Sequence, residues 1–178
     1  DDLTFKYSIY GGNIEIIKIV DQKQPEKNNF KELIMLAIIK HRDDLFDWLF
    51  EQKFAADIEK SDKKLLNSLM KCSVKNGNSY AIIKIVDKGF DLSSAFSKMI
   101  NYAASNGFYT IVQLIHKLVS KKHQMILYTT FNINSEIKFL PCVSNGNCSI
   151  LNFYIEYLNQ SAIEEIYIYA IINEYMNI

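Results

Sequence analysis

The sequence has little proline, glycine or cysteine and no long apolar run. Two prolines and six glycines among 178 residues exclude a collagen-like or linker-rich chain. The longest uncharged stretch, residues 139–155, has a polar centre and predicts no bilayer-spanning helix. No apolar signal segment opens the sequence, and three cysteines at unrelated spacings favour a reducing compartment. We therefore expect a cytoplasmic protein that makes no contact with a membrane.

An excess of either charge is also absent. The chain has 20 basic and 20 acidic residues, whereas a nucleic-acid-binding protein needs a basic surface for the phosphate backbone. The one basic cluster, residues 121–123, is typical of a solvated helix end. We expect no nucleic-acid partner, and the 49% of hydrophobic residues is enough for a buried core.

Groups of residues typical of a metal site, a catalytic site or a phosphate-binding loop are missing as well. His116, His123, Cys142 and Cys148 fit no common zinc-ligand spacing, because the sequence has no Cys-x-x-Cys pair. Cys148 as a nucleophile would need a pocket and an orienting group, which the sequence does not indicate. The glycines form no phosphate-binding loop. We expect no metal, no cofactor, no catalytic residue and no small-molecule substrate.

The sequence does contain an internal repeat. Residues 16–21, IIKIVD, return unchanged as residues 82–87, 66 positions later. Looser copies of two apolar, one polar and two apolar residues begin at Leu45, Ile111 and Ile150. This spacing is typical of the buried face of a helix. Five copies of one helical pattern predict a repeat architecture.

A turn precedes each copy and usually contains glycine, which adopts the left-handed conformation that ends a helix. His41 and Glu174 occupy the glycine position in two units. Those turns must be strained, differently shaped or longer. The glycines are Gly12, Gly107 and Gly146, four residues before the first apolar position, and Gly77, five residues before it.

A second helical pattern precedes each turn, and it is clearest in residues 30–38 and 96–104. Its fourth apolar position is always small, which predicts that a neighbouring helix crosses close to it. Trp48 falls on an apolar position of a second helix and is expected in the core. The small residues are Ser8, Ala37, Ser73, Ala103, Cys142 and Ala170.

The two patterns together predict an all-α solenoid of antiparallel helix pairs. One pair buries too little apolar surface to offset the entropy of ordering it, so the pairs should be stable only as a single stacked array. The array begins inside a first helix and ends where a sixth second helix would start, so we expect part of a longer protein. The expected units are residues 3–29, 30–60, 61–90, 91–122, 135–160 and an incomplete 161–178.

Two segments depart from the repeat. Residues 120–135 contain a β-prone apolar run and predict either an extended finger or a broken extra helix. Pro141 lies near the end of the fifth first helix and predicts a helix that starts late or kinks.

Residues 88–92, 103–107 and 111–115 together resemble one ankyrin repeat read straight through. The usual Thr-Pro-Leu-His opening is missing, and residues 98–101 read KMIN in its place, so the repeats are degenerate. First helices such as residues 37–44 resemble those of the large ankyrin-repeat families of protist parasites, trichomonads in particular.

The resemblance implies a non-catalytic scaffold that binds other proteins through a concave ridge and finger loops. The ridge joins the last turns of the first helices, and the fingers link one unit to the next. The ridge residues are Tyr10, Ile39, Lys40, Lys75, Asn76, Ser105, Asn106, Ser144, Asn145 and Asn173, and the finger residues are Asp57, Phe90, Asp91 and Ser94.

Two alternatives stay open. The chain could be a fixed structural component of a large assembly, such as cytoskeletal or ciliary microtubules, and large apolar side chains on the ridge would favour this. It could also be an enzyme with a site inserted at residues 120–135, which the absence of a pocket there would remove.

Overall fold

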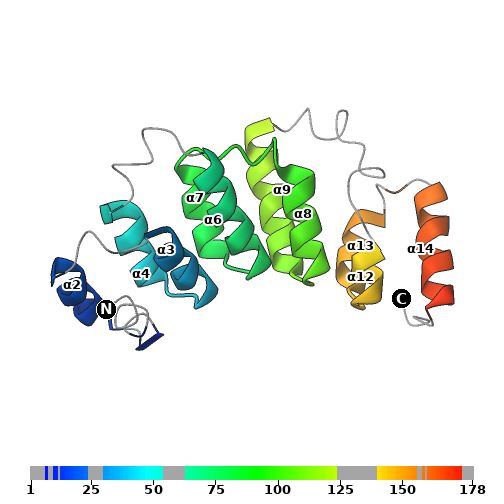
Figure 1. Cartoon of the computed structure of the whole chain (residues 1–178). Coiled ribbons are helices and arrows are strands. Elements are labelled where there is room, and N and C mark those ends of the chain that lie inside the picture. Colours follow the sequence, from blue (N-terminus) through cyan, green and yellow to red (C-terminus); the bar gives the residue numbers. More distant parts are fainter. Residues whose placement is uncertain are drawn as a thin grey trace. The chain divides into compact units, whose positions relative to one another are not determined.

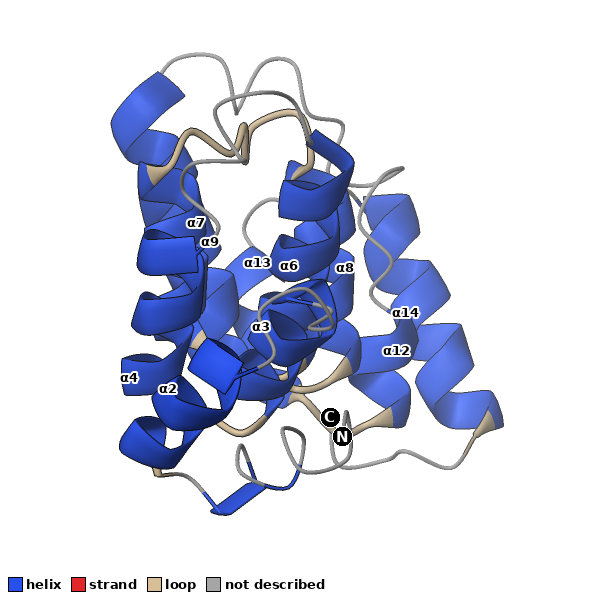
Figure 2. Ribbon diagram, turned by 60° about the vertical axis from the view of Figure 1, so that its left-hand side comes forward, coloured by secondary structure: helices blue, strands red, loops and turns tan. Residues whose placement is uncertain are grey.

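The computed structural model describes residues 7, 10–11, 13–23, 30–53, 63–123, 140–155, 158 and 160–173. Among these residues every regular element is a helix and no strand occurs (Figure 2), which confirms the expected all-α class. The chain divides into two compact units, Asp1–Phe90 and Asp91–Ile178.

In the first unit the helices from α3 to α7 pack against one another (Figure 1). α3 packs against α4, against the π-helical turn η1 that continues α4, and against α6; α6 also packs against α7. The described helices are α2 (Ile14–Lys23), α3 (Phe30–Ile39), α4 (Asp43–Asp47), η1 (Trp48–Lys53), α6 (Lys63–Lys75) and α7 (Ser79–Asp87).

The helices of the second unit also pack against one another. α8 packs against α9 and α12, and α12 packs against α13 and α14. α9 extends to His123, and residues 124–139 lie outside the described part of the chain, so the predicted finger or extra helix does too. The described helices are α8 (Phe96–Ser105), α9 (Tyr109–His123), α12 (Leu140–Ser144), α13 (Cys148–Tyr154) and α14 (Gln160–Ile172).

The small position of the first helices is fully buried in four units. Ala37, Ser73, Ala103 and Cys142 are each 0% exposed, as expected where neighbouring helices lie close. The Ser73 hydroxyl donates to the Leu69 carbonyl oxygen at 2.9 Å, which satisfies this polar group inside the core. Trp48, expected in the core, is only half-buried.

The four described turns between paired helices share one geometry. A residue with positive φ ends the first helix, and the amide of the next residue donates to the carbonyl oxygen of the small residue, as in a Schellman motif. These bonds run from Arg42 to Ala37 (2.9 Å), Asn78 to Ser73 (2.9 Å), Phe108 to Ala103 (3.0 Å) and Asn147 to Cys142 (2.8 Å). The φ angles are 51° at His41, 68° at Gly77, 73° at Gly107 and 67° at Gly146.

His41 therefore forms the same turn as the glycines, and of the three expected options the strained one is found. Glu174, the other non-glycine residue at this position, lies outside the described residues.

Because a left-handed L-residue costs about 1–2 kcal/mol and glycine loses about 0.5–1 kcal/mol more entropy on folding, we expect His41→Gly to raise the free energy of unfolding by about 0.5–1 kcal/mol. The shift of the urea midpoint measures this gain. His41→Ala keeps the strain and should give no gain; an equal gain in both variants would contradict the explanation.

The structure corrects the register of the repeat. Each left-handed residue lies four positions before a buried apolar residue, and after Gly77 that residue is Ala81, 0% exposed. Gly77 therefore has the same four-residue spacing as the other turn residues, and not the spacing of five that the sequence pattern indicated. Ile83, 39% exposed, takes the polar position that the sequence pattern had assigned to Lys84.

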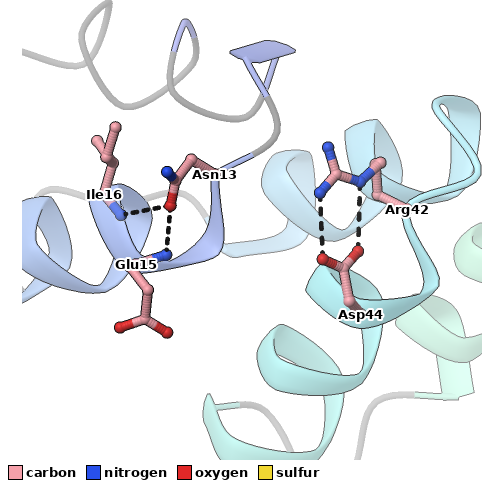
Figure 3. A network of polar contacts seen from close by, with 5 residues as sticks. All are labelled: Asn13, Glu15, Ile16, Arg42 and Asp44. Carbon is pink, nitrogen blue, oxygen red and sulfur yellow. Dashed lines mark hydrogen bonds and ion pairs between the residues drawn. The ribbon is translucent and has the colours of Figure 1, made fainter.

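The caps of α2 and α7 show the same shift. Asn13 accepts from the Ile16 amide at 3.3 Å (Figure 3) and Asn78 from the Ala81 amide at 2.9 Å, so Ile16 is equivalent to Ala81. These caps are 65 positions apart, 78 minus 13, whereas the identical hexapeptides are 66 apart. The identical hexapeptides therefore do not occupy equivalent structural positions, because they are shifted by one residue relative to the helix caps.

Pro141 lies in α12, whose described part begins at Leu140. The residues before it lie outside the described part of the chain, so the predicted late start or kink of this helix stays a prediction.

Candidate interaction surface

The predicted ridge residues lie at the surface or close to it. Tyr10 and Ile39 are 59% and 44% exposed. In the first unit the structure brings Tyr10 and Lys40 together, with the ammonium group of Lys40 4.9 Å from the centre of the tyrosine ring, within the range of a cation–π contact. Among the others, Lys75, Asn106, Asn145 and Asn173 are exposed and Asn76, Ser105 and Ser144 are half-buried.

Three ridge asparagines cap their own helices. In each, the side-chain amide donates to the backbone oxygen four residues earlier, at 2.8 Å. The carbonyl oxygens of Cys72 and Tyr169 also accept from the backbone amide of the same asparagine, at 3.1 and 3.2 Å, so the side chain adds a second bond at each helix end. Part of the hydrogen-bonding capacity of the ridge is therefore used within the fold. The pairs are Asn76 with Cys72, Asn106 with Tyr102 and Asn173 with Tyr169.

Other asparagines link one turn to the next. In the second unit the side-chain amide of Asn145 donates to the Ser105 carbonyl oxygen at 2.6 Å. In the first unit Asn78, only 2% exposed, donates to the Ile38 carbonyl oxygen at 3.1 Å and also caps α7. Sequence reasoning missed Asn78; its signal is an asparagine directly after the turn glycine, repeated at Asn13 and Asn147.

The finger residues divide into three cases. Phe90 is only 6% exposed and belongs to the core rather than to a contact surface. The Asp91 carboxylate accepts from the amides of Ser93 at 3.1 Å and Ser94 at 3.4 Å, and this Asx turn fixes the loop. Asp57 lies outside the described residues.

A polar cluster that the sequence did not reveal joins the second helices of the first unit. The Lys84 ammonium group lies 2.9 Å from Glu51, 3.4 Å from Asp47 and 5.4 Å from the centre of the Tyr80 ring. The Tyr80 hydroxyl donates to Asp47, and this hydrogen bond raises the pKa of Tyr80. The hydrogen bond to Glu51 raises the pKa of Lys84. The cluster holds α7 against α4 and η1.

A second ion pair lies at the start of α4. The guanidinium group of Arg42 bonds to the Asp44 carboxylate at 3.1 Å (Figure 3). This bond lowers the pKa of Asp44. The two side chains are partly exposed and lie only two positions apart in the sequence. The ion pair therefore orients the turn and contributes little to the free energy of unfolding.

An aromatic cluster surrounds His116 in the second unit. The imidazole ring lies 5.3 Å from the rings of Phe96 and Phe153 and 5.6 Å from that of Tyr154. Burial lowers the pKa of His116 below its ordinary value of 6.5, because a charged imidazolium loses hydration there.

The lowered pKa makes stability depend on pH. Below pH 6.5 the unfolded chain binds a proton at His116 while the folded chain resists it, so stability falls as pH decreases through this value. We expect the urea midpoint to drop between pH 7.5 and 5.5, and the drop to shrink in His116→Gln. An unchanged pH dependence in that variant would contradict the assignment.

Cys142 lies in the core and is fully buried. Burial raises the pKa of the Cys142 thiol to about 11, so it is protonated at neutral pH. Among the described residues, no group of three or more His, Cys, Asp or Glu side chains could hold a metal ion. In the same part of the chain, no helix has the length and apolar character needed to cross a bilayer.

Comparison with known proteins adds one match. A family model described as "Domain of unknown function (DUF3447)" matches residues 1–82. No curated protein and no solved structure matches the chain significantly.

Proposed function

We propose that the chain is a degenerate ankyrin-like array of helix pairs that binds other proteins and performs no catalysis. The observation that supports this is the shared turn geometry: each of four turns has a residue in the left-handed conformation and a hydrogen bond to the carbonyl oxygen of a buried small residue. A recurring helix–turn–helix unit is the element from which repeat proteins build extended binding surfaces.

The ridge is the proposed contact surface. Its first-unit part combines an exposed tyrosine, an exposed isoleucine and two lysines, Lys40 and Lys75. Aromatic and aliphatic side chains provide burial on binding, while cations provide orientation. Among the described residues, no cluster of metal-ligating side chains competes with it.

Cross-linking mass spectrometry on protein from its native source tests the surface. We expect Lys40 and Lys75 to cross-link to partner proteins. Lys88 and Lys117, exposed on or after second helices, serve as the internal control and should cross-link less. Cross-links confined to Lys88 and Lys117 would overturn the ridge as the contact surface.

One observation favours the alternative of a fixed component in a cytoplasmic assembly such as a cytoskeletal or ciliary lattice. Tyr10 and Ile39 are large apolar side chains left exposed, which is more typical of permanent than of transient interfaces. Native-source complexes that survive a 1 M salt wash and dilution would support permanent attachment, while release on dilution would support transient binding.

A further inference from the structure

Asparagine precedes the glycine at each of the three described glycine turns between paired helices. The sequence contains no other Asn-Gly pair. An asparagine followed by glycine is especially prone to spontaneous deamidation, because glycine has no side chain to shield its amide nitrogen. These first helices therefore all end in a chemically reactive pair. The pairs are Asn76-Gly77, Asn106-Gly107 and Asn145-Gly146.

Deamidation of such a pair needs only water and mild alkali. The glycine amide nitrogen loses its proton to hydroxide and attacks the side-chain carbonyl carbon of the asparagine. A C–N bond forms, and the side-chain nitrogen takes up a proton and leaves as ammonia. Water then opens the resulting succinimide ring at either carbonyl group and gives aspartate or isoaspartate. No oxidation or reduction occurs.

The folded turns oppose ring closure. The ring forms only when the glycine nitrogen lies on the Cβ side of the asparagine. At Asn106 ψ is 3°, so the Gly107 nitrogen eclipses the backbone nitrogen of Asn106 instead. The glycine amides are also engaged with the carbonyl oxygen three residues earlier. These bonds run from Gly77 to Val74 (3.3 Å), Gly107 to Ala104 (3.1 Å) and Gly146 to Val143 (3.0 Å).

The asparagine side chains are held as well. The side-chain amides of Asn76 and Asn106 donate to the carbonyl oxygen four residues earlier, at 2.8 Å. That of Asn145 donates at 2.6 Å to the carbonyl oxygen of Ser105, the residue before Asn106. Asn106 and Asn145 are exposed and Asn76 is half-buried. Ring closure must therefore break a side-chain bond and a glycine bond at each turn.

The product of deamidation cannot keep these bonds. A carboxylate only accepts hydrogen bonds, so an aspartate at position 106 or 145 has no proton to donate to the facing carbonyl oxygen. A negative charge at the C-terminal end of a helix is also unfavourable. Because Asn145 binds the carbonyl group next to Asn106, loss of its amide loosens the turn at Asn106 too.

We propose that Asn106 and Asn145 are sites of spontaneous deamidation that react when their turns open, and that reaction at Asn145 promotes reaction at Asn106. The second unit then accumulates negative charge at these turns as the protein ages. This modification goes beyond the proposed binding function and does not depend on whether the ridge binds protein.

Ageing the full chain in mildly alkaline buffer tests the gating. Peptide mass spectrometry measures the conversion at each asparagine, and chromatography separates isoaspartate from aspartate. We expect Asn106 and Asn145 to react at least about tenfold more slowly in the folded chain than in the same chain unfolded in urea, because two hydrogen bonds must break first. Asn173 makes the same side-chain bond as Asn106 but precedes Glu174, and it should react far more slowly in both states.

Asn145→Ala tests the coupling between the two turns. In the folded variant, deamidation of Asn106 should accelerate by about fivefold, the factor that corresponds to one ordinary hydrogen bond. Asn76 lies in the first unit and its rate should stay unchanged. An equal acceleration at Asn76 would overturn the coupling, because the whole chain would then open more often.

Two results would overturn the modification sites themselves. One is an equal rate in the folded and the unfolded chain, which would show that the turns do not control the reaction. The other is a folded chain that forms no aspartate or isoaspartate at Asn106 and Asn145 after prolonged ageing. Neither result bears on the cross-linking of Lys40 and Lys75.

Discussion

Replacing Asn78 with alanine is expected to lower the free energy of unfolding by about 2–4 kcal/mol. The side chain caps α7 through the Ala81 amide at 2.9 Å and binds the Ile38 carbonyl oxygen of the preceding turn at 3.1 Å. At 2% exposure, water does not replace these bonds. Alanine therefore removes the cap from the buried Ala81 amide. It also removes one of two donors from the Ile38 carbonyl oxygen, which keeps the His41 amide at 3.2 Å. Urea denaturation followed by circular dichroism measures the loss.

Asn13 provides the matched control for Asn78. It caps α2 in the same way, accepting from the Glu15 amide at 3.0 Å, but it is exposed. Asn13→Ala should cost about 1 kcal/mol. Asn78→Ser, which keeps a capping oxygen and loses the amide donor, should lie between the two. If Asn78→Ala costs no more than Asn13→Ala, the link between turns contributes nothing.

Gly107→Ala is expected to destabilise the chain by about 2–3 kcal/mol, because a left-handed L-residue costs about 1–2 kcal/mol and the new methyl group also meets a neighbour. Its Cβ would lie 2.8 Å from the side-chain oxygen of Asn147, which follows the next turn along the chain. The φ of 73° at Gly107 supplies the first part of the cost.

Gly146→Ala separates the cost of the left-handed conformation from the cost of the steric contact with Asn147. Gly146 has nearly the same φ, 67°, but no atom lies within 4 Å of an added Cβ, so only the conformational cost of about 1–2 kcal/mol remains. The urea midpoints of both variants compare them directly. Equal losses would show that Asn147 moves aside freely. Gly107→Ala in an Asn147→Ala background should cost about as much as Gly146→Ala.

Much of the fold was predictable because helical periodicity is local. Residues 30–38 and 96–104 place their apolar side chains on one face, and the expected core positions are buried in both except Phe30, which is half-buried. The small position was predictable for the same reason, since it recurs at a fixed distance before each turn. The candidate surface was less predictable: Phe90 is buried, and Asn76, Asn106 and Asn173 act as helix caps.

The sequence by itself determined the helical segments, their order and the turns at glycine, because these depend on side chains a few residues apart. The left-handed turn at His41 was decided by the structure. Tertiary structure decided the register, since only burial distinguishes Ala81 from the exposed Ile83 as a core residue. It also decided which polar groups bond across turns, as Asn78 does with Ile38 across 40 residues. Tyr167 and Ile171 follow the core pattern of a first helix and yet lie exposed, because a pattern records which face a helix can bury and packing decides whether a neighbour covers it.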